Sequence, residues 1–114
     1  MENLTNTTEE GKTIAIISYI TFIGLIIAFI MNNEKKNDFA SYHIRQSLGI
    51  FLLWIVVRTF LFIVSFIIYI PFLSGLINLG FIVLLVIGLV SAIQGEKKPI
   101  PALGEQFQQW FNTI

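Results

Sequence analysis

The sequence predicts an all-α membrane protein with three transmembrane helices. Hydrophobic residues make up 55% of its 114 residues and charged residues only 12%, well below the ~25% charged residues usual in soluble proteins. The apolar residues are gathered in long uncharged runs, each near the length that a helix needs to cross a bilayer. We therefore treat residues 1–114 as one integral membrane domain whose main partner is the lipid bilayer.

The first expected span covers residues 13–31, which carry no charge. A helix of this length extends for about 28 Å, close to the hydrocarbon thickness of a bilayer. Acidic rather than basic residues precede it, which argues against a secretory signal peptide. Gly24 and Ala28 lie four residues apart, a spacing that lets another helix approach closely.

A second span is expected over residues 47–70, after a short interfacial helix over residues 38–46. Asn37 or Asp38 can cap the start of that interfacial helix, because both side chains accept hydrogen bonds from exposed backbone N–H groups. The aromatic and polar residues that follow suit the headgroup region of a membrane.

A third span is expected over residues 76–94. The uncharged run over residues 59–95 would measure roughly 55 Å as one helix, which is too long for a single crossing. Pro71 and the neighbouring pair of Ser74 and Gly75 interrupt this run and predict a turn.

Residues 102–113 predict a short amphipathic helix at the C-terminal end, after a proline-rich turn. Its apolar positions follow the helical period, opposite several glutamines. The helix is too short to span, so it is expected to lie at the membrane interface, held by Phe107, Trp110 and Phe111. The alternative is a helix packed on the protein's own loop.

The distribution of basic residues predicts an orientation in the cytoplasmic membrane. Five lie between the first and second spans or after the third span, whereas only Lys12 lies on the opposite side. These five are Lys35, Lys36, Arg45, Lys97 and Lys98. Because basic loops remain in the cytoplasm, the N-terminus is expected outside and the C-terminus inside.

The second expected span carries the main candidate site. Four polar residues fall close to one line along a helix there: Ser47, Arg58, Ser65 and Tyr69. A charge within a bilayer is costly, and it usually faces the interior of a helix bundle or a wet cavity. Either this line forms a polar path or partner site, or Arg58 is a structural residue that reaches headgroups or backbone carbonyls.

His43, Arg45 and Gln46 form a second candidate, a polar cluster at the membrane edge. A single histidine in a chain without cysteine makes no convincing metal site, and we expect neither a metal nor a cofactor. No nucleophile motif, P-loop or dinucleotide motif is present, and the net charge of zero provides no basic surface for nucleic acid. His43 is therefore either a structural hydrogen-bonding residue or a functional group.

Three segments carry a family resemblance: residues 12–20 (KTIAIISYI), 39–48 (FASYHIRQSL) and 98–104 (KPIPALG). Together they resemble the small bacterial membrane proteins related to the chloroplast inner-envelope import (Tic) component. The resemblance implies a helical membrane protein and, for the plastid member, a part in protein translocation. It implies no catalytic residues. Members similar to the plastid protein have four spans, whereas the fourth position here is only the short C-terminal helix.

From these observations we expect a non-enzymatic, import-component-like subunit with a role in assembly or transport, acting as a homo-oligomer or with a protein partner. The alternative is a membrane-surface module that organises or senses anionic lipid through Lys35, Lys36, Lys97 and Lys98. A lipid-modifying enzyme that uses His43 is a third hypothesis, but it lacks an evident second catalytic group.

Overall fold

The computed structural model describes residues 4–101 and 103–114, and these residues form five helices and no strand. The helices are α1 (Leu4–Ile20), α2 (Phe22–Lys35), α3 (Asp38–Val64), α4 (Pro71–Ile93) and α5 (Gly104–Trp110). The all-helical prediction is therefore confirmed. The prediction of three spans is not confirmed, because α3 and α4 are the only described helices long and apolar enough to cross a bilayer.

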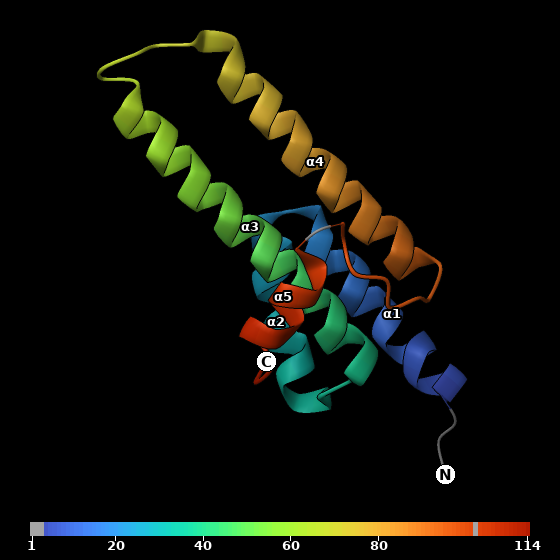
Figure 1. The fold of residues 1–114 in the computed structure, drawn as a ribbon. Coiled ribbons are helices and arrows are strands. Elements are labelled where there is room, and N and C mark those ends of the chain that lie inside the picture. Colours follow the sequence, from blue (N-terminus) through green and yellow to red (C-terminus); the bar gives the residue numbers. More distant parts are fainter. Residues whose placement is uncertain (1–3, 102) are drawn as a thin grey trace.

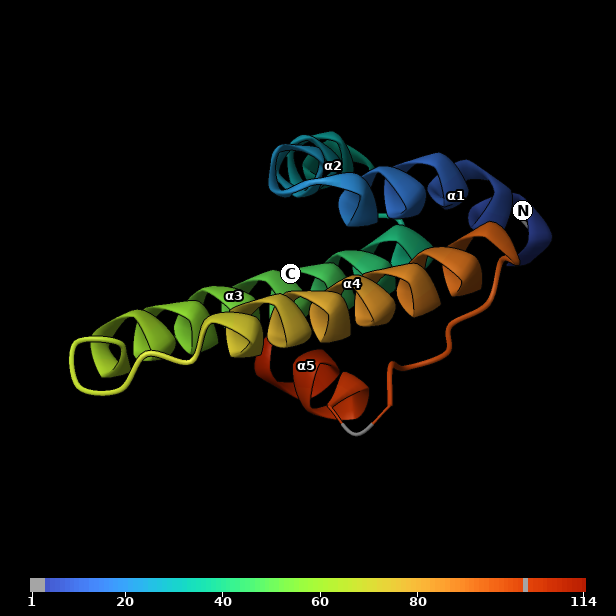
Figure 2. The ribbon, with the colours of Figure 1, turned by 90° about the horizontal axis from the view of Figure 1, so that it is seen from above.

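The two long helices, α3 and α4, form an antiparallel hairpin at the centre of the molecule (Figure 1). In the perpendicular view, α1 and α2 lie on one face of this hairpin and α5 lies on the other (Figure 2). These covering helices lie against only one half of the hairpin, and the other half projects beyond them. We call the projecting half, residues 52–80, the arm, and the rest of the described chain the base.

The expected first span over residues 13–31 is not one helix. α1 ends at Ile20, and Thr21 adopts an extended conformation with φ −149° and ψ 171°. The Thr21 hydroxyl then caps α2 by accepting a hydrogen bond from the Gly24 N–H at 2.9 Å. Gly24 lies so close to the Ile17 carbonyl that a Cβ there would overlap it. Gly24 therefore allows a close approach to the last turn of α1 within the interrupted segment. Close packing of another helix on the pair of Gly24 and Ala28 stays a prediction.

The break at Thr21 follows from the direction of α1. Gly11 lies against Asn37 at the start of α3, and Ser18 lies against Ser47 further along, so α1 and α3 run in the same direction. Two residues alone separate α2 from α3. The chain must therefore reverse direction after α1 to reach the start of α3. A straight helix through Thr21 would instead extend away from the start of α3.

The second expected span is also shifted. α3 starts at Asp38 and continues without interruption, so residues 38–46 do not form a separate interfacial helix. The side-chain oxygen of Asn37 caps α3 by accepting from the Ala40 N–H at 3.0 Å, as predicted. α3 ends at Val64 rather than at residue 70.

The turn of the hairpin comes before Pro71 rather than over Pro71 to Gly75, so α4 starts five residues earlier than the expected third span. Ile70 is extended, with φ −121° and ψ 95°, because a following proline disfavours the helical conformation. Pro71 then occupies the first turn of α4, where its missing N–H costs no hydrogen bond. The resulting turn covers residues 65–70.

The buried residues of the hydrophobic core all lie in the base, and from the arm only Leu53, partly buried, packs against them among the described residues. One cluster joins α1, α3, α4 and α5, and a second joins α1, α2 and α3. No residue of the arm, all of which the structure describes, is buried. The fold therefore divides into a packed base and a hairpin that meets its surroundings with apolar side chains.

Candidate functional site

The base holds a group of buried polar side chains that come from α3. His43, Gln46 and Ser47 are each 0% exposed. α1 covers them from one side, and the segment after α4 together with α5 covers them from the other. Buried polar groups destabilise a protein unless they form hydrogen bonds. The partners of these side chains therefore show whether they join helices or are free for another role.

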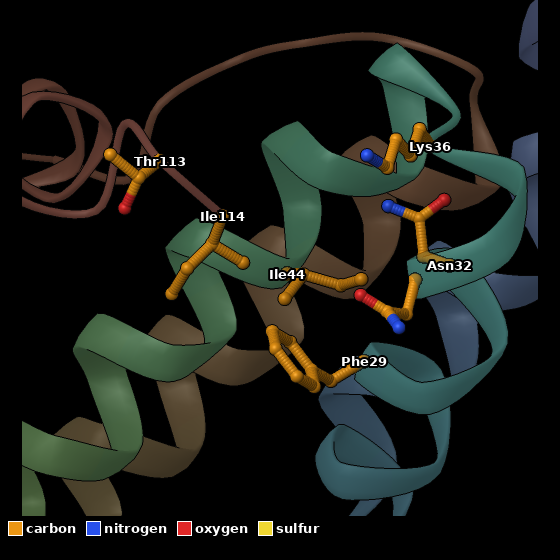
Figure 3. A pocket seen from close by; sticks show the side chains of 7 residues that line it. Phe29, Asn32, Lys36, Ile44, Thr113 and Ile114 are labelled. Atoms are coloured by element: carbon orange, nitrogen blue, oxygen red, sulfur yellow. The ribbon is translucent and has the colours of Figure 1, made fainter.

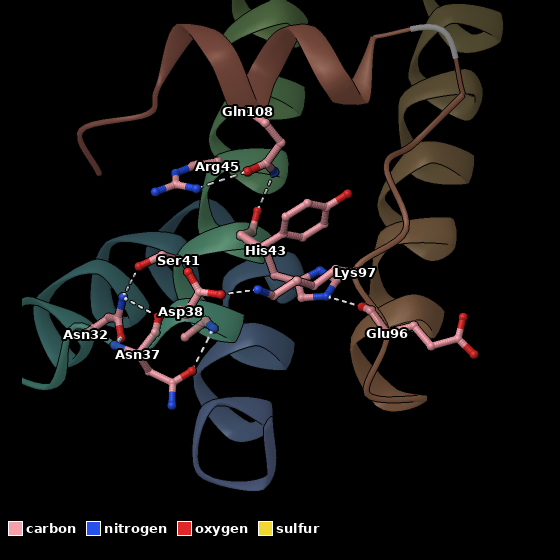
Figure 4. Close-up of polar contacts among 11 residues, drawn as sticks. Asn32, Asn37, Asp38, Ser41, His43, Arg45, Glu96, Lys97 and Gln108 are labelled. Atoms are coloured by element: carbon pink, nitrogen blue, oxygen red, sulfur yellow. Dashed lines mark hydrogen bonds and ion pairs between the residues drawn. The ribbon is translucent and has the colours of Figure 1, made fainter. Parts of the chain in front are cut away.

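His43 joins α1 to the segment that follows α4, and Figure 4 shows its hydrogen bond to Glu96 in that segment. Its Nδ1 lies 2.7 Å from the Tyr19 hydroxyl, and its Nε2 lies 2.7 Å from the Glu96 carbonyl oxygen. Because a carbonyl oxygen only accepts hydrogen bonds, Nε2 carries the proton and Nδ1 can accept from Tyr19. Both nitrogens of a neutral imidazole are thus occupied by structural partners.

Gln46 fixes the proline-rich segment before α5. Its Nε2 donates to the Gly104 carbonyl at 2.6 Å, and its Oε1 accepts from the Ile100 N–H at 3.0 Å. A Cβ at Gly104 would lie 2.8 Å from that same Oε1. One side chain therefore satisfies two backbone groups, and Gly104 makes the close approach possible.

Arg45 and Gln108 tie α5 to α3. The Arg45 guanidinium donates to the Gln108 Oε1 and to the Asn112 carbonyl, both at 3.3 Å. Gln108 Nε2 in turn donates to the Tyr42 carbonyl at 2.8 Å. His43, Arg45 and Gln46, predicted as one polar cluster, therefore make three separate connections from α3. Arg45 and Gln46 both attach the C-terminal segment that contains α5 to α3.

The three expected interface anchors have different surroundings. Phe107 is 2% exposed, because its ring lies directly over Gly49 of α3. It therefore fastens α5 to α3 and cannot anchor the helix in lipid. Trp110 is 63% exposed, whereas Phe111 is half-buried beside the core. α5 itself is shorter than the expected helix over residues 102–113, of which residue 102 lies outside the described residues. Contact of Trp110 with lipid stays a prediction.

The expected polar line through Arg58 is not assembled. Ser47 donates to the Ser18 carbonyl in the base, and Ser65 donates to the Phe62 carbonyl at 2.6 Å at the end of α3. Tyr69 lies beyond the end of α3 and is 75% exposed. Arg58 is half-buried in the arm and forms no hydrogen bond or ion pair within the described chain. A functional role for Arg58 stays a prediction.

Sequence reasoning missed three other polar residues of the base, Ser18, Tyr19 and Asn32. Asn32, the residue after the expected first span, is 4% exposed. It donates to Ser41 Oγ at 2.8 Å and accepts from the Asn37 N–H at 2.8 Å. Ser18 and Tyr19 were read as part of an apolar span. Their position as neighbouring polar residues in that run was the available signal.

The lysines of the lipid-binding alternative fall into two pairs. Lys97 pairs with Asp38, and Lys98 pairs with Glu96 at 2.7 Å. Lys35 and Lys36 form no ion pair with any residue that the structure describes. Within the same residues, no group of three or more His, Cys, Asp or Glu side chains is placed to hold a metal ion.

The fold and the site define a small α-helical membrane protein in which a packed base supports a projecting two-helix hairpin. The chain belongs to the Magnetosome magnetite crystal formation protein family (MamF/MmsF), whose family model matches residues 10–106. This family match gives no support to the expected resemblance to the chloroplast import (Tic) family.

Two relatives are UPF0132 membrane proteins of the archaeon Methanocaldococcus jannaschii. One is 35% identical over 78 residues, covering 68% of this chain and 67% of the relative. The other is 29% identical over 106 residues, covering 92% of this chain and 70% of the relative. No solved structure matches the chain.

Proposed function

We propose that the protein is a non-enzymatic assembly subunit, with the arm inserted in the bilayer and the base held at the membrane surface as a rigid platform. The platform holds other copies of the chain or a protein partner. The observation that carries this proposal is that the two buried polar side chains at the centre of the base, His43 and Gln46, use their polar atoms to join separate segments of the chain. Both ring nitrogens of His43 and both ends of the Gln46 amide have structural partners, whereas an acid–base catalyst needs an atom free to reach its substrate.

The dimensions of the hairpin support this placement. α3 has 27 residues and α4 has 23, so they extend for about 40 Å and about 35 Å, more than the ~30 Å hydrocarbon core of a bilayer. Most large side chains of the arm are apolar and exposed, as expected for a surface in contact with lipid. The excess length leaves the first turns of α3, with their polar side chains, outside the hydrocarbon.

The paired helices α1 and α2 are proposed to enter the membrane only part of the way. Phe22, beside the break between them, meets Phe51 near the middle of α3, with ring centroids 5.9 Å apart. Ile20 and Ile23 beside it are 61% and 68% exposed. This apolar corner points toward the arm (Figure 1), so it is suited to the upper hydrocarbon layer of the same leaflet.

This arrangement changes the expected orientation of the N-terminus. Lys12 follows Gly11, which lies against Asn37, so Lys12 joins the other lysines and Arg45 at the base. Every basic residue except Arg58 then lies on one side of the bilayer. Since basic regions remain in the cytoplasm, we place both ends of the chain inside the cytoplasmic membrane instead of on opposite sides.

The family description, magnetosome magnetite crystal formation, is compatible with such a platform, because growing a mineral at a membrane needs components gathered on its surface. For this chain we take over only the assembly role. The alternative of a surface that senses anionic lipid is weakened by the carboxylate partners of Lys97 and Lys98, but it retains Lys35 and Lys36.

Cysteine labelling tests the placement, because the chain contains no cysteine. Single variants Thr7→Cys, Ile68→Cys and Thr113→Cys would be treated in intact cells with an impermeant thiol reagent. We expect only Ile68→Cys, in the turn of the hairpin, to be labelled. Labelling of Thr7→Cys would restore a complete first span and contradict the arrangement proposed here.

The assembly role is tested by the mass of the protein extracted in a mild detergent or in native lipid discs. We expect a homo-oligomer or a stable complex with a partner. A strict monomer without any partner in both preparations would contradict the role, even if the labelling confirmed the orientation.

A further inference from the structure

A cavity of about 250 Å³ opens at the edge of the base, where α2 ends. Seven residues line it: Phe29, Asn32, Asn33, Lys36, Ile44, Thr113 and Ile114. Phe29 and Asn32 come from α2 and Lys36 directly follows it, Ile44 comes from α3, and Thr113 and Ile114 come from the C-terminal segment (Figure 3). None of these residues except Asn32 belongs to the hydrogen-bonded network described above.

The lining of this cavity is divided by chemistry. Phe29, Ile44 and Ile114 form an apolar wall, whereas Asn33, Lys36 and Thr113 provide polar groups. Phe29 is 45% exposed, and Ile30 beside it is 63% exposed, so the apolar wall continues onto the outer surface of α2. A ligand that fits both parts has one polar, anionic end and one apolar end.

Lys36 has a backbone conformation that is unusual for its residue type. Its φ of 48° makes it the one non-glycine residue with a positive φ among the described residues. Its N–H donates to the Asn32 carbonyl at 2.7 Å, which ends α2 in the way that usually favours glycine. Strained backbone of this kind is often found at functional sites. Here it places an ammonium group without a carboxylate partner beside the cavity.

We propose that this cavity binds one anionic phospholipid of the leaflet that faces the base. The lipid phosphate meets Lys36 and the polar groups of Asn33 and Thr113, with Lys35 adding a second positive charge nearby. The first carbons of one acyl chain lie against Phe29 and Ile44, and the rest follows the exposed surface of α2. A free phosphate would use only the polar half of the cavity and would leave the apolar wall in water.

This inference rests on the proposed position of the base at the membrane surface, but its test does not use that position. Protein purified in detergent would be incubated with phosphatidylglycerol or phosphatidylcholine, and bound lipid would be counted by native mass spectrometry. We expect wild-type protein to retain one phosphatidylglycerol and to discriminate against phosphatidylcholine. If the protein retains the lipid but Thr7→Cys is labelled from outside, the orientation alone is contradicted. If the labelling is as expected but no lipid is retained, the lipid site alone is contradicted.

Lys36→Gly is the decisive variant, because it removes the ammonium while suiting the positive φ, so the fold is retained. Retention of phosphatidylglycerol should fall about fivefold, the effect of one basic group at an anionic membrane surface. Lys98→Gln is the matched control: it removes one positive charge outside the cavity and should leave retention unchanged. An equal fall in both variants would show general charge attraction and overturn the site.

Two further measurements test the apolar half of the cavity. Phe29→Ala should weaken retention of phosphatidylglycerol, because it shortens the wall along which the acyl chain lies. Inorganic phosphate at millimolar concentration should fail to displace the bound lipid. Displacement by inorganic phosphate, or equal retention of phosphatidylcholine, would overturn the proposal of a phospholipid.

Discussion

The base and the arm share the two long helices α3 and α4, but they are stabilised in different ways. In the base, polar side chains such as His43 and Gln46 are buried, and each is hydrogen-bonded within the chain. In the arm, apolar side chains are exposed, and Arg58 has no partner among the described residues. The base therefore holds itself together, whereas the arm depends on what surrounds it.

The difference in burial follows where the covering helices lie. α3 is equally helical on both sides of Phe51, yet all its buried residues lie at or before Phe51. α1, α2 and α5 reach no further along the hairpin (Figure 2). Substitutions in the base should therefore change stability within a single chain, whereas substitutions in the arm should change insertion or association.

The largest loss of stability is expected for His43→Leu. This change leaves the Tyr19 hydroxyl and the Glu96 carbonyl buried with a lost partner, which should lower the free energy of unfolding by roughly 3 kcal/mol. The measurement is a denaturant titration in detergent followed by far-ultraviolet circular dichroism. Ser65→Ala in the arm is the control and should change the free energy by less than about 0.5 kcal/mol. Equal effects of the two variants would remove the distinction between base and arm.

A smaller loss is expected for Gly49→Ala, because its new methyl group would overlap the Phe107 ring. Overpacking of this kind costs about 1–3 kcal/mol, and here it should loosen α5 before the rest of the base. Tryptophan fluorescence in a Trp54→Phe background would report the surroundings of Trp110. The double variant Gly49→Ala with Phe107→Ala should regain part of the loss, since the two sites are in contact. If the losses of Gly49→Ala and Phe107→Ala simply added in the double variant, Phe107 would not be in contact with Gly49.

Trp54→Phe should have a still smaller effect. Trp54 Nε1 donates to Asn78 Oδ1 at 2.8 Å, and this exposed bond joins the two helices of the arm. Side-chain hydrogen bonds between membrane helices contribute about 0.6 kcal/mol on average. The same unfolding titration should show a loss of that order, and a loss as large as that of His43→Leu would show that the arm is also held together from within.

Arg58→Leu should have the smallest effect on the stability of one chain, because no interaction within the described residues is lost. Arg58 lies roughly 9 Å before the end of α3 at Val64, nearer to the far interface than its place midway along the expected span over residues 47–70 implies. We expect normal or improved insertion, together with a smaller oligomer or a lost partner. Arg58→Lys should restore association only in part, because lysine lacks the planar guanidinium. An unchanged oligomer in Arg58→Leu would make Arg58 a tolerated residue.

The features that could be predicted from the sequence depend on local composition and spacing. The helical class follows from the long uncharged runs, and the cap at Asn37 follows from its side chain and its place before a helix. The end of α3 was also within reach, because Pro71 disfavours helix at Ile70 and is itself favoured at a helix start. The predicted turn over Pro71 to Gly75 was wrong because Pro71 starts α4 instead of interrupting a helix.

Other features depend on contacts between distant segments. Nothing in residues 13–31 interrupts a helix locally, and the break at Thr21 arises because α1 packs parallel to α3 with a two-residue link before it. Phe107 fits the pattern of an interface anchor, and only the position of Gly49 beneath its ring makes it a core residue. The partners of Gln46 lie more than fifty residues further along the chain.

The sequence by itself determined that this chain is helical, apolar and suited to a membrane, because hydropathy and helical period are properties of neighbouring residues. The tertiary structure alone decided which polar residues hold the base together and which charge is left without a partner in the arm. Hydrogen bonds form between groups that packing brings within about 3 Å. Their pairing therefore follows from how α1 and α5 cover one half of the hairpin.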